Sequence, residues 1–280
     1  MIPILLVAIG LLGLLIASLF DIKTKEVPDW LNFSMLSAGI SLRLMQSVST
    51  GLWRYLIYTL LAVAVMFFIG ILMYYTKQWG GGDTKLLVAI AAIFTIVPNQ
   101  DYFLISLMVN LVIVSTFYGL FWCIYFAVKN SAKFKKELPI YLHKNMNKIK
   151  SYVIVVLILL LPLLLINSIA LKILLLSAAL ILFIYPLLTT FIEAVERSAM
   201  FKEVKIEKLT EGDWITKDIR YKNKLIYSKS SPGIEKSQIN MLRKLNIKYV
   251  PVKDGIPFVP AFLISTIITL LLGNLVLSAI

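Results

Sequence analysis

Long apolar runs separated by short charged stretches make up most of the sequence. Such runs favour membrane-crossing helices, because a helix satisfies its own backbone hydrogen bonds where water is absent. The candidate spans are Ile2–Phe20, Leu31–Val48, Trp53–Tyr75, Thr84–Val97, Tyr102–Val128, Tyr152–Ile166, Ile169–Phe191 and Pro257–Ile280. The pattern predicts a polytopic α-helical membrane protein with about eight, and at least six, transmembrane helices.

Three of these runs are less typical of a span. Leu31–Val48 carries Arg43 and several serines, and Thr84–Val97 and Tyr152–Ile166 are shorter than the ~20 residues that a simple span needs. A short run is tolerated where the bilayer thins or where the bundle surrounds it. Tyr152–Ile166 and Ile169–Phe191 can alternatively form one re-entrant hairpin.

Residues 197–256 form the one sizeable polar stretch. Lys205–Leu209, Trp214–Tyr227 and Tyr249–Val252 have the composition of strands, with a hairpin turn at 222–224, and Glu235–Leu245 has helical periodicity. We therefore predict a membrane-embedded helical core over 1–196, a small cytoplasmic α+β domain over 197–256 and a C-terminal transmembrane helix over 257–280.

The distribution of positive charge predicts the orientation. If the N-terminus lies outside, the segments on the cytoplasmic side hold 25 of the 28 Lys and Arg residues. Positive residues are retained on the cytoplasmic side of membrane proteins. Met1–Phe20 lacks a basic start and a small-residue cleavage site, so it is interpreted as a retained span. The prediction is a multi-pass protein of the cell membrane with both termini outside.

Composition narrows the chemistry further. The chain is 59% hydrophobic with a net charge of +13, which in a membrane protein indicates contact with anionic lipids rather than nucleic acid. Cys123 is the one cysteine and His143 the one histidine, the latter in a lysine-rich stretch expected to be a loop. Disulfides, the usual structural zinc sites and His-based catalytic dyads are therefore not expected, and no metal or cofactor is predicted.

Two aspartates stand at predicted span ends on the same, cytoplasmic side. Asp21 ends the first span and Asp83 begins the fourth. Two carboxyls held close together cannot both ionise easily, so they share a proton. The ionised member can take a proton from water while the protonated member polarises a scissile carbonyl. Asp21 and Asp83 are therefore the candidate catalytic pair.

The helix dipole suggests how this pair divides its proton. An anion is favoured at the start of a helix and disfavoured at its end, so the hypothesis is that Asp21 carries the shared proton more often. Simpler interpretations exist for each residue alone. Asp83 can be the N-cap of the fourth span, Asp21 an interfacial charge, and the neighbouring Glu26 and Asp29 solvated loop acids.

Three consecutive glycines precede Asp83. Gly80, Gly81 and Gly82 can adopt positive φ and let another backbone approach closely, as an extended peptide substrate requires. They are candidate substrate-binding residues.

Together the two aspartate segments resemble the type IV prepilin peptidases, including the archaeal preflagellin peptidases. The family pairs an aspartate at the end of the first span, followed by a basic stretch and a proline, with a second aspartate in a GxGD motif. The matching residues are Asp21, Lys23, Lys25, Val27, Pro28 and Trp30-Leu31-Asn32, then Gly80, Gly82, Asp83 and Lys85-Leu86-Leu87. Residues 208–214 and 253–260 also resemble the C-terminal region of archaeal members.

The resemblance implies an aspartic endopeptidase that removes the leader, or class III signal peptide, from pilin-like or archaellin precursors. The basic leader stays in the cytoplasm and cleavage falls at the cytoplasmic membrane boundary. The expected partners are these precursors and membrane lipids. The sequence leaves open which precursor is cleaved and what the oligomeric state is.

Three other classes of protein share some of these features. Presenilin-like and signal-peptide-peptidase-like proteases also use a GxGD aspartate, but their partner aspartate lies within a span rather than at its end. A transporter places charges near the bilayer midplane, and most span interiors here lack carboxylates. A non-catalytic scaffold docking partners through 197–256 is excluded only if both Asp→Asn changes abolish activity.

Overall fold

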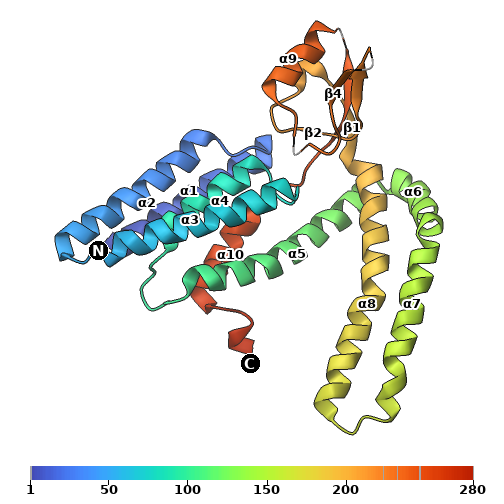
Figure 1. Ribbon diagram of the computed structural model, residues 1–280, viewed down its shortest axis with the longest axis horizontal. Helices are drawn as coiled ribbons and strands as arrows, with labels where there is room; N and C mark the ends of the chain where they lie inside the picture. Colours follow the sequence, from blue (N-terminus) through green and yellow to red (C-terminus); the bar gives the residue numbers. More distant parts are fainter. Residues whose placement is uncertain (1, 223, 232, 246, 280) are drawn as a thin grey trace. The chain divides into compact units, whose positions relative to one another are not determined.

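In the computed structural model the described residues are 2–222, 224–231, 233–245 and 247–279, and most of them are helical (Figure 1). The chain divides into two units, which are described separately. Unit 1 comprises Met1–Leu120, Ile206–Lys248 and Gly255–Ile280, and unit 2 comprises Phe121–Lys205 and Tyr249–Asp254.

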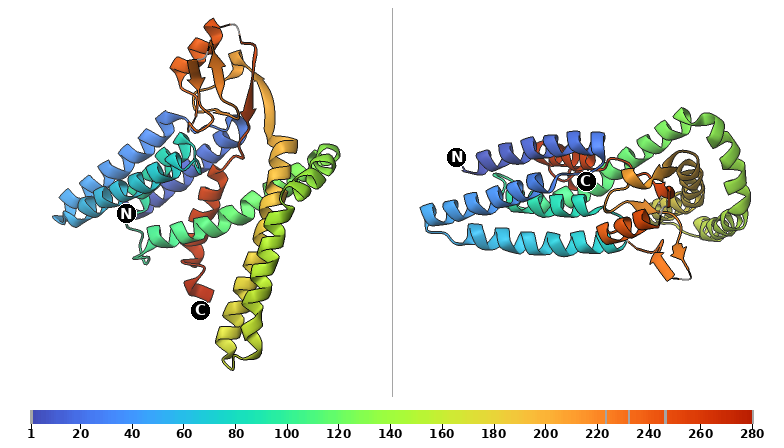
Figure 2. Two further views of the ribbon diagram at one scale, coloured as in Figure 1. Left: turned by 45° about the vertical axis from the view of Figure 1, so that its right-hand side comes forward. Right: turned by 90° about the horizontal axis from the view of Figure 1, so that it is seen from above.

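The helical part of unit 1 is a bundle. Its helices are α1 (Ile2–Thr24), α2 (Asp29–Thr50), α3 (Arg54–Tyr75), α4 (Gly81–Phe94), the first part of α5 (Phe103–Lys129) and α10 (Val259–Leu272). Helices α1 to α4 lie alongside one another in every view (Figures 1 and 2). α10 follows them by more than 160 residues in sequence yet packs against α1.

Small residues allow these helices to pack closely. A Cβ atom added to Gly39 of α2 would lie 2.8 Å from the backbone carbon of Ala92 in α4. One added to Gly70 of α3 would lie 2.7 Å from the Thr84 side chain. Close backbone approach through glycine is a common basis of helix association in membranes. Both α2 and α3 therefore use a glycine to pack against α4.

Helix α4 forms the centre of the unit 1 core. Every residue from Leu86 to Phe94 is buried. Beyond its last turn lies the guanidinium of Arg43, which is fully buried. Arg43 donates from Nη2 to the backbone oxygens of Ile93 and Ile96, at 3.2 and 2.6 Å, and from Nη1 to Oε1 of Gln46 at 2.9 Å. These donors satisfy carbonyls that the end of a helix otherwise leaves unpaired.

The polar part of unit 1 contains η3 (Ile206–Lys208), β2 (Trp214–Ile215), β3 (Ile219–Tyr221), β4 (Lys224–Tyr227) and α9 (Lys236–Lys244). Strands β3 and β4 pair antiparallel, which confirms the predicted hairpin, although Asn223 lies outside the described residues. The helix predicted at Glu235–Leu245 is confirmed as α9, with Ile239 and Leu242 buried.

Two strand predictions in this region differ from the structure. The strand expected between Trp214 and the hairpin turn is interrupted, because the chain turns at 216–218 between β2 and β3. The run Lys205–Leu209 is mostly the 3₁₀ turn η3, closed by a hydrogen bond from the Leu209 N–H to the Ile206 carbonyl. Ile206 and Leu209 are both buried by this turn, which accounts for an apolar pattern that resembled a strand.

Unit 2 is built on a helical hairpin. It contains α6 (Ser131–Lys144), α7 (Met146–Leu160), η1 (Leu161–Leu164), α8 (Ile169–Val195) and the π-helical turn η2 (Glu196–Met200). Figure 1 shows α7 and α8 running side by side, joined at one end. Strands β1 (Phe201–Lys205) and β5 (Tyr249–Lys253) pair antiparallel, and β5 confirms the strand predicted at Tyr249–Val252.

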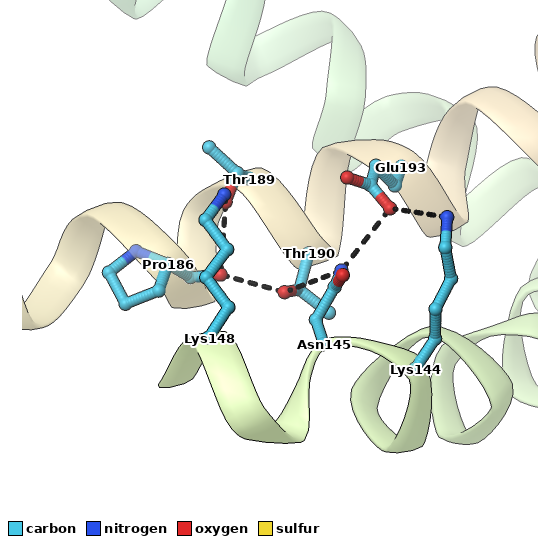
Figure 3. A network of polar contacts seen from close by, with 7 residues as sticks. All are labelled: Lys144, Asn145, Lys148, Pro186, Thr189, Thr190 and Glu193. Atoms are coloured by element: carbon cyan, nitrogen blue, oxygen red, sulfur yellow. Dashed lines mark hydrogen bonds and ion pairs between the residues drawn. The ribbon is translucent and has the colours of Figure 1, made fainter. Parts of the chain in front are cut away.

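Polar contacts tie the start of α7 to α8 (Figure 3). The Asn145 side-chain amide donates to Oγ1 of Thr190 and to Oε2 of Glu193, each at 3.2 Å. Lys144 forms an ion pair with the same Glu193 oxygen at 3.5 Å, and Lys148 donates to Oγ1 of Thr189 at 3.3 Å. Interhelical hydrogen bonds of this kind stabilise helix pairs in membranes by roughly 1 kcal/mol each.

Among the described residues, five helices are long and apolar enough to cross a membrane. They are Ile2–Thr24, Arg54–Tyr75, Phe103–Lys129, Met146–Leu163 and Ile169–Met200. The chain is thus a mostly helical, multi-pass membrane protein with a small sheet region. Of the remaining predicted spans, α4 and α10 have 14 residues each, and α2 is not apolar enough.

One helix boundary and one predicted loop differ from the structure for local reasons. The helix predicted to run through Pro257–Ile280 ends at Leu272, because Gly273 adopts φ 70° and stops it. The lysine-rich stretch expected as a loop is the helix α6, with His143 exposed in its last turn. Its lysines alternate with Phe134, Leu138 and Leu142, so an amphipathic helix forms where charge alone suggested a loop.

Candidate active site

Asp21 lies near the end of α1 and is only 5% exposed. Its Oδ2 accepts a hydrogen bond from the backbone N–H of Val259 at 2.8 Å, and the backbone of Phe258 is also hydrogen-bonded to this carboxyl. Val259 is the first residue of α10. The start of α10 therefore holds the carboxyl group that ends α1.

Asp83 lies in the first turn of α4 and is partly buried. The helix begins at Gly81, so Asp83 is its third residue and not its N-cap, as one interpretation had it. Its Oδ2 accepts the backbone N–H of Gly80 at 3.0 Å. The carboxyl folds back over the start of its own helix, which is the reciprocal half of a capping box.

The carboxyl of Asp83 is affected by the charge of Asp21. Burial raises the pKa of Asp83 from its ordinary 3.8 to about 7, the Gly80 N–H opposes this rise, and the charge of Asp21 adds to it. Repulsion between like charges has this effect only at short range. Both predicted site residues therefore lie in one electrostatic site, formed by the end of α1 and the start of α4.

The helix-dipole argument had assigned the shared proton to Asp21. Burial favours the protonated form of Asp83 as well, because a carboxyl with a pKa of about 7 holds a proton about half the time at neutral pH. Asp21 is buried too, at 5% exposed, so which of the two holds the proton more often stays a prediction. Desolvation of a charge is a larger effect than the 0.3–1 kcal/mol typical of a helix dipole.

The three glycines do not have the conformation expected of them. Gly81 and Gly82 belong to α4, and Gly80 is its N-cap with φ −75°. None of the three has a positive φ, so that reason for glycine was wrong. A Cβ added to Gly82 would lie 3.5 Å from the backbone nitrogen of Val27, an ordinary contact. Their role in substrate binding stays a prediction.

Charged residues near the site pair at the surface. Lys85, in the second turn of α4, forms an ion pair with Asp29 of α2 at 2.6 Å, and both side chains are well exposed. Glu26 is exposed as well. An exposed pair contributes about 0–1 kcal/mol, so this contact orients the first turns of α2 and α4 more than it stabilises them.

Sequence reasoning missed the contribution of α10 and of Trp79. The Trp79 ring lies 6.0 Å from that of Phe258 and 5.4 Å from that of Phe262, measured between ring centroids. Pro260 at the second position of α10 is a helix-start signal that places Val259 at the first position. Nothing in the local sequence, however, connects this start to Asp21.

The other reactive side chains lie elsewhere. Cys123 is buried in unit 2 against Val195, and His143 is exposed on α6. Within the part of the chain that the structure describes, no group of three His, Cys, Asp or Glu side chains is placed to hold a metal ion.

Comparison with known proteins shows which family the sequence around the two aspartates resembles. Residues 8–128 match the type IV leader peptidase family. The matched region contains most of α1, all of α2 to α4 and most of α5, and hence both Asp21 and Asp83. The leader-peptidase match does not extend to α10 or to the hairpin of unit 2.

Individual relatives agree with the family match. The chain is 38% identical over 86 residues to the preflagellin peptidase of Methanococcus voltae, covering 31% of this chain and 36% of that protein. It is 34% identical over 85 residues to the preflagellin peptidase of Methanocaldococcus jannaschii, covering 30% and 36%. For the prepilin peptidase EppA of Methanothermobacter thermautotrophicus the identity is 31% over 98 residues, covering 35% and 26%.

These relatives are matched only in part. The chain spans about a third of the length of the curated relatives it matches. No solved structure matches the chain.

Proposed function

We propose that this protein is a membrane aspartic endopeptidase that cleaves the leader from type IV pilin-like or archaellin precursors, with Asp21 and Asp83 as its catalytic pair. The observation that carries the proposal is that the charge of Asp21 acts on the carboxyl of Asp83 and helps to raise its pKa. Both lie within the region that matches the type IV leader peptidase family.

The proposed mechanism is general acid–base catalysis by the pair. One carboxylate takes a proton from the attacking water while the protonated partner donates to the carbonyl oxygen of the scissile bond. We assign the proton to Asp83 in the resting enzyme, since burial raises the pKa of Asp83 to about 7. Asp21 is then the base, and the two exchange roles when the leaving amine is protonated.

The proposed substrate follows from the relatives, which are named preflagellin and prepilin peptidases. A precursor of this type has a basic leader and a hydrophobic helix, with the scissile bond between them. The pair lies at the end of the apolar helix α1, beside Lys23 and Lys25, which the positive-inside rule places on the cytoplasmic side. We therefore propose cleavage at the cytoplasmic boundary of the membrane.

A cleavage assay in membranes tests the proposal. Wild type, Asp21→Asn and Asp83→Asn are incubated with pilin-like and archaellin-like precursors, and product is followed by the loss of the leader. Asn keeps the shape of the side chain but cannot exchange a proton. We expect wild type to cleave and each variant to lose about a hundredfold to ten-thousandfold in kcat/KM, since acid–base catalysis contributes about 10²–10⁴.

Asp101→Asn is the matched control, because Asp101 is an exposed aspartate in the turn before α5. It should retain wild-type activity, and equal amounts of inserted protein are checked for all variants. Near wild-type cleavage by Asp21→Asn or Asp83→Asn would remove that residue from the site. A wild type that cleaves none of the precursors would refute the proposed substrate class.

A further inference from the structure

We propose that the start of α10 completes the catalytic site, with the backbone N–H of Val259 as a positioning group for the Asp21 carboxylate. This inference rests on the proposed function and adds to it a component from outside residues 8–128. Its basis is the contact between α1 and α10 within unit 1.

The hydrogen bond to Asp21 is short and shielded from water. It measures 2.8 Å from the Val259 nitrogen to Oδ2, Val259 is fully buried, and Asp21 is 5% exposed. A hydrogen bond to a charged group is among the stronger ones in proteins, and water cannot replace it in a buried site. With Oδ2 engaged, the other carboxylate oxygen has a fixed direction.

The donor belongs to the N-terminus of a helix that carries no acidic residue of its own in its first turn. The free N–H groups and the partial positive charge at such an end favour an anion. Phe258, the N-cap residue, is hydrogen-bonded through its backbone to the same carboxyl. The carboxylate of α1 thus occupies the position that an acidic capping residue of α10 would take.

A cluster of three aromatic rings links this donor to the one that holds Asp83. Gly80 donates to Asp83, and its neighbour Trp79 packs against Phe258, the neighbour of Val259. Phe262, one turn into α10, closes the cluster at 5.4 Å from Trp79 and 5.5 Å from Phe258. Both carboxyls are therefore held by backbone N–H groups whose adjacent side chains pack on each other.

The far end of α10 is fixed as well. Asn110 of α5, which is fully buried, donates from its side-chain amide to Oγ1 of Thr269 at 2.9 Å and to the Gly273 carbonyl at 2.7 Å. Gln100 donates to the Leu270 carbonyl at 3.0 Å. These polar contacts oppose sliding of α10 along the bundle, so the position of its first N–H relative to Asp21 is set at both ends.

Val259→Pro is the direct test, because it removes one N–H at a helix position where proline is favoured. The variant is assayed for precursor cleavage across pH. We expect kcat to fall about tenfold to a hundredfold, the loss of one hydrogen bond to a charged group. The acidic limb of the pH–rate profile should move to higher pH, because the ionised form of the pair loses a donor.

Two controls separate this effect from general damage. Val259→Ala keeps the N–H and removes the buried side chain, so it should lower the melting temperature while the acidic limb stays in place. Ile169→Pro makes the same change at the first residue of α8, whose first turn contains no acidic residue, and should cleave like wild type. Wild-type rate and pH profile for a folded Val259→Pro would overturn the inference while leaving the proposed function intact.

Val259→Pro places a proline after Phe258, whose α conformation is disfavoured before proline, so this variant can fail to insert. A second pair of variants then tests the positioning role of α10. Trp79→Ala removes the ring that supports the start of α10, and Trp79→Phe keeps an aromatic contact. We expect a lower kcat and the same pH shift for the alanine variant, with both restored toward wild type by phenylalanine. An unshifted pH profile in both would contradict a positioning role for α10.

Discussion

The helix α4 of unit 1 and the hairpin α7–α8 of unit 2 have similar apolar sequences but different surroundings. Nine consecutive residues of α4, Leu86–Phe94, are buried by other parts of the protein. The hairpin instead leaves most of its apolar side chains uncovered, among them Ile158, Leu174 and Ile181. An apolar run therefore identifies a segment kept away from water without saying whether protein or lipid covers it.

The lengths of α4 and α8 agree with this difference in their surroundings. α4 has 14 residues, about 21 Å at the rise of an α-helix, against the ~30 Å of hydrocarbon in a bilayer. A helix enclosed by protein on all sides does not need to match that thickness. α8, with 27 residues, is about 40 Å long and can span it. The short helix that carries Asp83 is thus an interior element, and its first turn depends on what surrounds it.

The largest expected effect comes from Arg43, whose substitution tests whether protein surrounds the end of α4. Replacing it by leucine leaves the carbonyls of Ile93 and Ile96 without their donor at the end of α4. Each unsatisfied buried group costs about 1–3 kcal/mol, so we expect a loss of about 4 kcal/mol in the free energy of unfolding. Chemical denaturation of the purified protein in detergent measures it.

Arg54→Leu is the matched control, because Arg54 is exposed at the start of α3 and only lies over the Tyr55 ring. It should change stability by less than about 1 kcal/mol. Equal losses for the two arginines would mean that the end of α4 is not capped as described.

A pair of isoleucines compares the two units directly. Ile90 of α4 is fully buried, whereas Ile181 of α8 is 67% exposed. Ile90→Ala should cost about 3 kcal/mol because it opens a cavity in a packed core. Ile181→Ala should stay within about 0.5 kcal/mol, as expected for a residue with few protein contacts. Unfolding curves for both variants test this, and a large loss at Ile181 would indicate that protein covers the hairpin.

The pH dependence of stability tests the first turn of α4. The pKa of Asp83 is about 7 in the folded state and 3.8 ordinarily, so the folded state binds this proton more tightly. Its contribution to stability is complete below pH 3.8 and is lost as pH rises through 7. We expect wild type to lose roughly 2 kcal/mol between pH 5 and pH 8, and Asp83→Asn to lose less. Parallel curves for the two proteins would contradict the burial of this carboxyl.

Periodicity and charge were sufficient to predict much of the fold. The apolar runs predicted α1, α3, α5 and α8 to within a residue or two, apart from the last turns of α1 and α8. The polar stretch predicted the hairpin β3–β4, α9 and β5. These elements are determined locally, by composition and turn residues. α6 was missed because its lysines suggested a loop, and the end of α10 because Gly273 lies within an apolar run.

In the candidate site, too, some features could be predicted from the sequence and others could not. Asp21 and Asp83 could be selected from sequence because each lies at a span end in a distinctive local segment. The donor to Asp21 could not be predicted from sequence, because every residue except proline has a backbone N–H and the amino-acid type does not show which one donates. The raised pKa of Asp83 was missed for a related reason. A dipole argument uses one helix, whereas desolvation depends on every element packed around the carboxyl.

The hydrogen bond between Asp21 and Val259 also orders events during synthesis. The two residues are 238 positions apart, and a ribosome adds about 5–20 residues per second. Asp21 is therefore made roughly 10 to 50 seconds before its donor exists. During that time α1 is already apolar and long enough to enter the bilayer, with its carboxyl unpaired. The hydrogen bond between α1 and α10 therefore forms only after nearly the whole chain has been synthesised.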